Sequence, residues 1–220
     1  MSRGRRTGSV TDATGRVRRA FDASAARYDR SMAQAERWVL GEQRRWAVSR
    51  ARGRVLEIAV GTGLDLPLYG EGVDEVVGVD LSPAMLDVAR RRLRDRGPGG
   101  PPVELRVGDA QALDLPTASV DTVVSTYSLC AVPDPARALD EARRVLRPGG
   151  RLVLVEHGPA LTRWVRAGQR LLDPVTVRLH EEHLLRDPAE AARGAGFDVA
   201  EVDRGGRAGL VHRVLAAAPR

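Results

Sequence analysis

Several residue types whose presence would point to a particular function are absent or scarce in this chain. It contains no lysine, so all 35 of its basic residues are arginines. Its only cysteine, Cys130, excludes an intrachain disulfide and any metal site built from several cysteines, and no other pattern suggests a bound metal. No apolar run approaches the roughly 20 residues that a membrane-spanning helix needs. No apolar segment follows the charged first residues, as a secretory signal would require, and we therefore expect a cytoplasmic protein.

The formal net charge of +6 would suit a nucleic-acid partner. However, the arginines alternate with acidic residues along the chain and form no single basic patch. Their abundance, together with that of alanine, glycine and proline, is typical of a bacterial genome rich in G and C. We therefore expect no nucleic-acid partner and a small-molecule substrate. The sequence leaves open whether the protein is a monomer or a homodimer.

With 220 residues, 43% of them hydrophobic, the chain is long enough for one full α/β domain. Residues 1–20, rich in arginine, glycine, serine and threonine, predict a flexible tail. Helical patterns follow over residues 16–28 and 33–51. Residues 21–220 then predict a single domain with four parts: N-terminal helices over 21–52, a core over 53–157, lid or substrate helices over 158–196, and a C-terminal hairpin over 197–217.

From Arg54 onward, short apolar runs alternate with helical periods, which indicates parallel β-α-β units. Two connecting helices begin with Ser82-Pro83 and Asp134-Pro135, where an N-cap residue precedes proline at the first helical position. The sequence thus predicts an α/β fold with a Rossmann-like, mostly parallel sheet that ends in an antiparallel hairpin. The predicted strands are residues 55–60, 76–80, 103–107, 121–126 and 151–156, with hairpin strands at 197–202 and 210–217.

The ends of the first three predicted strands carry residues that suggest a ligand site. The first strand ends in Gly61-Thr62-Gly63, where glycine lets the backbone turn and approach a ligand closely. Asp80 closes the second strand and can accept hydrogen bonds from both hydroxyls of a ribose. Asp109 follows the third, where it can meet an adenine amino group. Singly, the glycines could mark only a tight turn and Asp80 only a helix cap, but their order and spacing favour a nucleoside-containing cofactor.

The same loop argues against a dinucleotide. A dinucleotide fingerprint needs a third glycine, and Leu66 stands at that position. Asp65 would in addition repel a pyrophosphate. S-adenosylmethionine carries a sulfonium cation and no phosphate, so a pocket lined by acids favours it over NAD or FAD.

From Phe21 to Ala217 the chain resembles the class I methyltransferases, which have a seven-stranded Rossmann-like fold and convert S-adenosyl-L-methionine to S-adenosyl-L-homocysteine. It is most similar to the branch that includes the ubiquinone/menaquinone C-methyltransferases and bacterial phospholipid N-methyltransferases. The motifs that carry the resemblance are Val55 to Gly63, Val79 to Leu86, Gly108 to Gln111, Val132 to Pro135 and Leu146 to Gly150.

The resemblance implies a set of cofactor contacts. These are Glu57, Gly61, Thr62, Gly63, Ser125 and Thr126 at the methionine and ribose end, Asp80 at the ribose hydroxyls, and Leu81, Met85, Asp109 and Ala110 around the adenine. Tyr28 matches a tyrosine that closes over the cofactor in relatives, although it could equally pack a helix onto the domain. Ala59 departs from the first motif, which has glycine there. A methyl group fits if this residue has a negative φ, and the departure leaves a non-catalytic relative as an alternative.

The C-terminal half suggests the class of acceptor. It resembles a narrower subgroup that methylates small thiols or lipid amines, through Glu156-His157, Gln169 to Pro174, His183 to Asp187 and Ala195 to Phe197. The helix expected over Leu161 to Leu172 has an apolar face. That face predicts a lid over an apolar substrate pocket, with a peripheral role at a membrane surface as the alternative.

Methyl transfer is an in-line displacement that needs an aligned nucleophile and the exclusion of water. A thiol attacks as its thiolate, so a nearby base or cation would help. His157 and His183, and less strongly Glu156, are the catalytic candidates, although either histidine could instead be a structural residue. We expect Cys130 to be a packing residue.

The sequence therefore predicts an enzyme, an S-adenosylmethionine-dependent methyltransferase that acts on a heteroatom, preferably a thiol sulfur, of a small molecule. A phospholipid N-methyltransferase or quinone C-methyltransferase at a membrane surface is one alternative. A cofactor-binding protein without transferase activity is the other.

Overall fold

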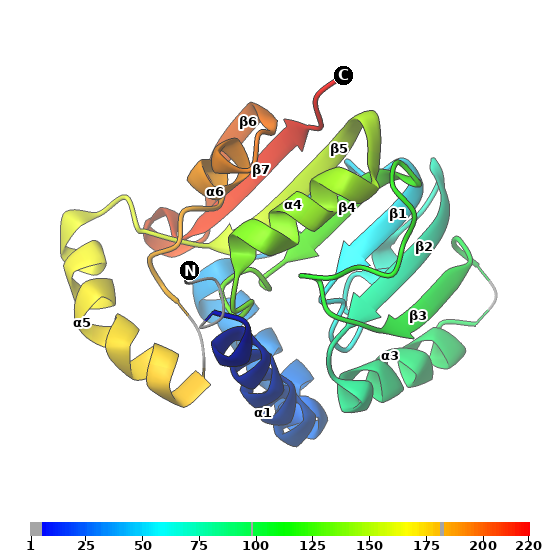
Figure 1. Ribbon diagram of the computed structural model, residues 1–220. Helices are drawn as coiled ribbons and strands as arrows, with labels where there is room; N and C mark the ends of the chain where they lie inside the picture. Colours follow the sequence, from blue (N-terminus) through cyan, green and yellow to red (C-terminus); the bar gives the residue numbers. More distant parts are fainter. Residues whose placement is uncertain (1–5, 98, 181–182) are drawn as a thin grey trace.

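The computed structural model describes residues 6–97, 99–180 and 183–220 and contains one seven-stranded sheet with helices on both faces (Figure 1). The strand order is β3-β2-β1-β4-β5-β7-β6, and β7 runs opposite to the other six strands. The strands are β1 (Gly53–Ile58), β2 (Val73–Asp80), β3 (Val103–Val107), β4 (Val120–Thr126), β5 (Leu146–His157), β6 (Asp198–Gly205) and β7 (Val211–Ala217). The predicted fold class and the C-terminal antiparallel hairpin are confirmed.

The central strands are buried on both faces, as parallel strands between helix layers must be. One apolar layer packs under α4 (Pro135–Val145) and α6 (Pro188–Gly194). The other packs under α2 (Arg44–Val48) and α3 (Pro83–Asp95). Adjacent residues Val55 and Leu56 of β1 enter opposite layers because side chains alternate along a strand. The strand order reverses between β1 and β4, which places a ligand crevice at their carboxyl ends.

Helix starts follow the signals in the sequence. The Ser82 hydroxyl accepts a hydrogen bond from the Met85 N–H at 3.1 Å, and the Asp134 carboxylate accepts one from the Arg137 N–H at 3.1 Å. Asp187 caps α6 in the same way. Each cap is followed by proline, whose missing N–H costs nothing in the first turn. The predicted starts of α3 and α4 are therefore confirmed.

The N-terminal segment differs from the prediction. A single 30-residue helix, α1 (Arg6–Ala35), replaces the expected helix over 16–28 and includes most of the expected tail over 1–20. It continues into one turn of π-helix, η1 (Glu36–Leu40), and stops at Gly41, whose φ is 73°. The helix expected over 33–51 is thus divided between α1, η1 and α2. The sequence from Arg6 to Leu40 contains no proline, so no residue interrupts the helix.

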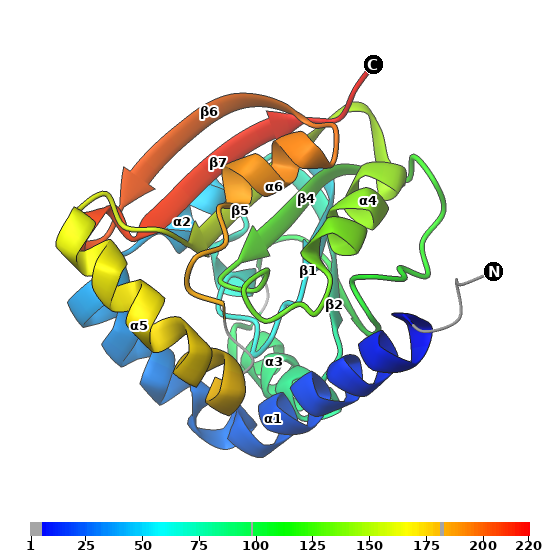
Figure 2. The ribbon, with the colours of Figure 1, turned by 60° about the vertical axis from the view of Figure 1, so that its left-hand side comes forward.

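Side-chain hydrogen bonds hold α1 across the carboxyl edge of the sheet (Figure 2). Asp22 accepts from the Ser82 hydroxyl at 2.5 Å, and Asp29 accepts from the Thr62 hydroxyl at 2.6 Å. Asp29 also pairs with Arg92 of α3 at 2.5 Å. This edge of the sheet is therefore covered by α1.

The remaining helix, α5 (Arg163–His180), stands at the side of the molecule beyond β5 (Figure 1). It begins close to the predicted start but runs past Leu172 and includes Pro174. Two short 3-10 helices, η2 (Leu66–Leu68) and η3 (Arg207–Gly209), complete the elements. Within the described ranges, none of the helices has the length and hydrophobicity to cross a bilayer.

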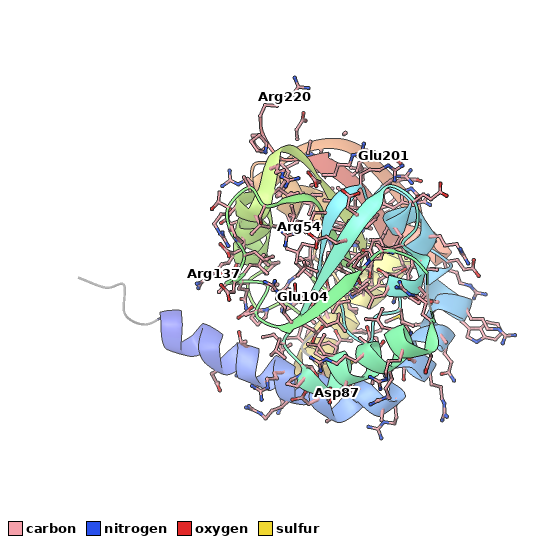
Figure 3. The ribbon with its side chains drawn as sticks, turned by 90° about the vertical axis from the view of Figure 1, so that its right-hand side faces the viewer. Arg54, Asp87, Glu104, Arg137, Glu201 and Arg220 are labelled. Atoms are coloured by element: carbon pink, nitrogen blue, oxygen red, sulfur yellow. The ribbon has the colours of Figure 1, made fainter. Side chains whose placement is uncertain are left out.

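The face formed by β2, β3 and α3 carries charges of both signs. Figure 3 shows Asp87 and Glu104 on it and Arg54 of β1 beside it. Arg54 pairs with Glu75 at 2.6 Å, Arg90 with Asp87 at 2.7 Å, and Arg106 with Glu104 at 2.7 Å. The alternation of arginine and acid in the sequence thus produces local ion pairs here.

Candidate functional site

A cavity lies at the carboxyl ends of β1 to β4, beneath α1. The structure brings seven of the predicted cofactor contacts into its lining: Tyr28, Gly61, Asp80, Leu81, Met85, Asp109 and Ala110. The wall also contains residues that the sequence analysis missed. These are Val17 and Phe21 of α1, Gln111, and, after β4, Tyr127, Ser128, Ala131, Val132 and Pro133. Phe21 and Tyr28 meet edge to face, with ring centroids 6.3 Å apart. Both aromatic rings that α1 contributes therefore face the predicted cofactor site.

Asp80 connects the tips of β1 and β2. One carboxylate oxygen accepts from the Gly61 N–H and the other from the Ser82 N–H, each at 2.8 Å. The side chain is 8% exposed. Burial raises the pKa of Asp80, and the two backbone hydrogen bonds oppose that rise. Each oxygen keeps a second lone pair that can accept a hydroxyl hydrogen from the cavity.

The two glycines of the loop have different tasks. A Cβ on Gly61 would meet nothing nearer than the Ala59 carbonyl at 3.9 Å, so the backbone there is open to a ligand. A Cβ on Gly63 would lie 2.7 Å from Leu66 Cδ1 and 3.1 Å from Ala89 Cβ. Gly63 therefore allows tight packing of the loop against α3 and is not part of the cavity lining.

The sequence analysis expected Ala59 to be tolerated if its φ were negative, and the structure contradicts this condition. Its φ is 51°, in the left-handed region where a Cβ crowds the following carbonyl group. The residue lines the cavity. The glycine that the family has at this position would adopt this conformation without strain.

A buried polar cluster lies beside the cavity and includes two further predicted residues. Arg44 donates to Asp65 Oδ1 at 2.9 Å and to Thr126 Oγ1 at 3.0 Å, and Thr126 donates to Asp65 Oδ2 at 2.8 Å. Burial raises the pKa of Glu57 well above its usual range, and the neighbouring Asp65 carboxylate raises it further. Thr126 and Glu57 thus belong to this cluster and not to the cavity lining.

Arg44 lies within the helical pattern over residues 33–51, and in the structure its side chain is only 12% exposed. It also donates to Glu36 of η1 at 2.6 Å and stacks on the Tyr127 ring at 5.4 Å. The residues next to Arg44 in the sequence do not indicate that it is buried, because its partners Asp65 and Thr126 are distant in the sequence.

Glu156 organises the loop after β4. It accepts from the Ser125 hydroxyl at 2.7 Å, from the Ser128 N–H at 2.9 Å and from the Leu129 N–H at 3.2 Å. Burial raises its pKa to about 6, against the effect of these hydrogen bonds. Ser128 lines the cofactor cavity, but Glu156 and Ser125 do not. The predicted roles of Glu156 as a base and of Ser125 as a cofactor contact remain predictions.

His157 lies in the lining of two other cavities. One contains Glu156 and Arg186, and the other is an apolar groove of about 450 Å³ between η1 and α5. Burial lowers the pKa of His157 to about 4, with smaller effects from His212 and Arg186, so its imidazole is neutral at neutral pH. This apolar groove is lined by Val39, Leu40, Val165, Gly168, Leu172, Leu184 and Leu210 together with His157 and Gln169.

The structure does not bring His183 into either cavity that contains His157. Its backbone N–H donates to the Cys130 carbonyl at 3.2 Å. Cys130 is 4% exposed, as expected for a packing residue. The catalytic role of His183 therefore remains a prediction.

Comparison with known proteins places part of the chain in a recognised sequence group. Residues 56–154 match the family model described as a methyltransferase domain. Phosphatidylethanolamine N-methyltransferase from Cereibacter sphaeroides is 46% identical over 110 residues, which are 50% of this chain and 53% of that protein. Demethylmenaquinone methyltransferase from Clavibacter sepedonicus is 34% identical over 164 residues, 71% of this chain and 64% of that protein. The chain thus spans less than two thirds of either relative.

Solved structures show the same fold. A SAM-dependent methyltransferase from Thermotoga maritima superimposes with a TM-score of 0.68 at 24% identity, covering 91% of this chain and 99% of that one. The seven-stranded architecture is therefore that of the class I methyltransferases.

The conformation of Ala59 predicts that Ala59→Gly stabilises the protein. Glycine relieves the left-handed strain, and we expect the free energy of unfolding to rise by about 1 kcal/mol. Ala118, with a φ of 52° on an exposed loop, is a matched comparison, and Ala118→Gly should have a similar effect. Thermal and urea unfolding measure both. A lower melting temperature for Ala59→Gly alone would contradict the assigned conformation.

The lowered pKa of His157 predicts an acid-sensitive contribution to stability. The unfolded chain takes up the proton near pH 6.5 and the folded protein only near pH 4, so stability is complete above pH 6.5 and is lost as the pH falls toward 4. Between pH 7.5 and pH 5 this loss amounts to about 2 kcal/mol. Between these two pH values, His157→Gln should lose about 2 kcal/mol less free energy of unfolding than the unmodified protein, as measured by urea titration. Comparing the two pH values removes any constant packing cost, and equal losses in both proteins would refute the prediction.

Proposed function

We propose that the protein is an S-adenosylmethionine-dependent methyltransferase, because residues 56–154 match the methyltransferase domain family model and the sheet has the class I fold. The observation that carries the proposal is the Asp80 carboxylate at the floor of a cavity, hydrogen-bonded to the Gly61 backbone. A carboxylate in this position recognises a ribose, and the open backbone at Gly61 admits the atoms next to it.

The residues present fit this cofactor. The Tyr127 hydroxyl is buried without a hydrogen-bond partner in the described part of the chain, and its residue lines the cavity. Met85, Leu81 and Val17 supply apolar surface that suits an adenine ring. The cavity thus combines an apolar wall with polar groups that have capacity for further hydrogen bonds.

Each of the lining residues has a proposed task. Asp80 holds the ribose hydroxyls, and Leu81 and Met85 flank the adenine. Asp109, which accepts hydrogen bonds from the Gln111 backbone and side-chain amides at 2.9 Å, faces the adenine edge. Phe21 and Tyr28 of α1 exclude water from above. When bound, the cofactor supplies a methyl group that its sulfonium has already activated, so the protein's task is to align the acceptor.

The acceptor that we propose is the amine of a lipid. The apolar groove accommodates hydrocarbon, and the relative from Cereibacter sphaeroides is a phospholipid N-methyltransferase. A neutral amine attacks without first becoming an anion. His157, which burial keeps neutral, is only a weak base for the proton that the amine loses. A weak base suits a nucleophile that needs little activation.

A thiol acceptor, which the C-terminal motifs led us to expect, receives less support. A thiolate is favoured by a nearby cation. Arg186 is the cation beside His157, and its Nη1 already donates to the carbonyls of Leu129, Cys130 and Val132. The comparisons reported above concern amine and quinone substrates. C-methylation of a quinone with an apolar tail is the second candidate, because the same groove and the relative from Clavibacter sepedonicus favour it.

Asp80→Asn tests the cofactor assignment. The variant loses the charge that strengthens both ribose hydrogen bonds, and we expect the affinity for S-adenosylmethionine and S-adenosylhomocysteine to fall about a hundredfold. Titration calorimetry measures both ligands. Asp87→Asn, on the exposed face of α3 (Figure 3), is the control and should bind normally. An unchanged affinity in a folded Asp80→Asn protein would refute the assignment.

A panel of acceptors with methyl-labelled cofactor tests the substrate class. Micelles containing phosphatidylethanolamine should accept label and yield a monomethylated amine. A demethylated quinol and a small thiol serve as competing substrates in separate reactions. Label on the thiol alone would reverse the preference stated here, and label on the quinol alone would favour the second candidate. Cofactor binding without transfer to any acceptor would favour a non-catalytic protein.

A further inference from the structure

Most of the large apolar side chains that the protein exposes lie on α5 and η1. Trp164 is 87% exposed and Leu171 79% exposed, both on α5. In the described part of the chain, seven of the ten large exposed apolar residues lie on these elements and an eighth, Leu161, just precedes α5, whereas Val107 and Val202 lie elsewhere. We call this surface the docking face: Trp38 and Val39 of η1, Leu161 just before α5, and Trp164, Val165, Leu171, Leu172 and Val175 of α5.

The docking face belongs to one continuous surface. Val39 of η1 and Val165 and Leu172 of α5 line the same apolar groove, so the two elements are neighbours. In both views α5 lies at the outside of the molecule, in Figure 1 on the side away from β3, and in Figure 2 it runs beside the C-terminal part of α1. The groove therefore opens where the exposed apolar residues are densest.

The helix α5 attaches to the protein through its polar residues. Gln169 is 8% exposed, donates to the carbonyls of Gly158 at 2.9 Å and Leu184 at 3.2 Å, and accepts from the Ala160 N–H at 2.8 Å. Asp173 accepts from the Leu184 N–H at 2.6 Å. A helix of a globular protein normally buries its apolar stripe and exposes its polar one. In α5 the leucines and the tryptophan are exposed together with the arginines, and Gln169 and Asp173 face inward, so the apolar side chains are available to a partner.

The charges around the docking face favour an anionic partner. Arg163, Arg170 and Arg178 of α5 and Arg37 of η1 are exposed. The only acidic residue within α5 is Asp173, which is turned inward to Leu184. By contrast, three arginines on or beside the β2-β3-α3 face, Arg54, Arg90 and Arg106, are paired with acids (Figure 3). A second copy of this chain would bring arginines against arginines, whereas anionic headgroups would neutralise them.

We propose that the docking face rests on an anionic lipid bilayer, with Trp164 and Leu171 at the level of the acyl chain boundary and the arginines among the phosphates. Tryptophan prefers this interface because its ring is apolar and its N–H is polar. The groove then opens toward the bilayer, so that a lipid acceptor reaches His157 without crossing water. This last step rests on the proposed function, whereas docking itself does not.

Sedimentation of the full chain with vesicles tests the proposal. The protein should bind vesicles of phosphatidylcholine with phosphatidylglycerol and bind phosphatidylcholine alone much more weakly. Trp164→Ala combined with Leu171→Ala should lower the partition coefficient at least about tenfold. Val107→Ala combined with Val202→Ala, which removes exposed apolar groups elsewhere, is the matched control and should leave the partition coefficient unchanged.

A second pair of variants tests the charges. Arg163→Gln with Arg170→Gln should weaken binding to the anionic vesicles about thirtyfold, since each arginine near such a surface contributes a factor of about five. Arg91→Gln with Arg94→Gln, two exposed arginines of α3, should have no effect. Raising the salt concentration should reproduce the first result in the unmodified protein.

Three outcomes would overturn the proposal: no binding to anionic vesicles, equal weakening by the control pairs, or a stable dimer in solution that Trp164→Ala dissociates. Transfer to a short-chain, water-soluble amine separates the two proposals, because it needs no bilayer. Vesicle binding without any transfer refutes the function and leaves docking intact. Transfer to the soluble amine without vesicle binding refutes docking and leaves the function intact.

Discussion

The site depends on one carboxylate that is placed where water cannot stabilise it. Asp80 ends a buried strand, and burial alone would drive it toward its neutral form. The N–H groups of Gly61 and Ser82 offset this by donating to separate oxygens. These two contacts join the tip of β1, the tip of β2 and the start of α3 around a single side chain. The loop that bends at Gly61 and the helix that begins at Pro83 therefore keep their positions relative to each other.

The N-terminal segment is attached to the same edge by a different kind of contact. Asp22 reaches Ser82, Asp29 reaches Thr62, and Arg44 reaches Asp65, each by hydrogen bonds. Val17 and Ala25 of α1 are buried as well, so apolar contact adds to these hydrogen bonds in holding α1 over the cavity.

The sheet and its ligand crevice could be predicted because their signals are local. Buried strands are short apolar runs, and Ser82 and Asp134 mark the starts of their helices by capping an N–H three residues later. Seven predicted contacts line the cavity for the same reason, since strand tips of a doubly wound sheet meet at one edge. What could not be predicted depends on distant partners. Arg44 is buried because Asp65 and Thr126 approach it, and Ala59 takes a positive φ that no neighbouring residue indicates.

The helix α5 shows why periodicity has a limited reach. Its apolar stripe was predicted, but periodicity identifies two faces of a helix and not which of them is buried. The choice follows from what each face meets. Gln169 and Asp173 satisfy backbone groups of the chain segments on either side of α5, at Gly158, Ala160 and Leu184, which would otherwise be buried without partners. One unsatisfied backbone group costs about 1–3 kcal/mol, roughly what the burial of one leucine gains, and four such groups are satisfied here, so the side of α5 that carries Gln169 and Asp173 turns inward. The apolar face is left on the outside beside the groove, and so the same hydrogen bonds that secure α5 also leave the docking face exposed.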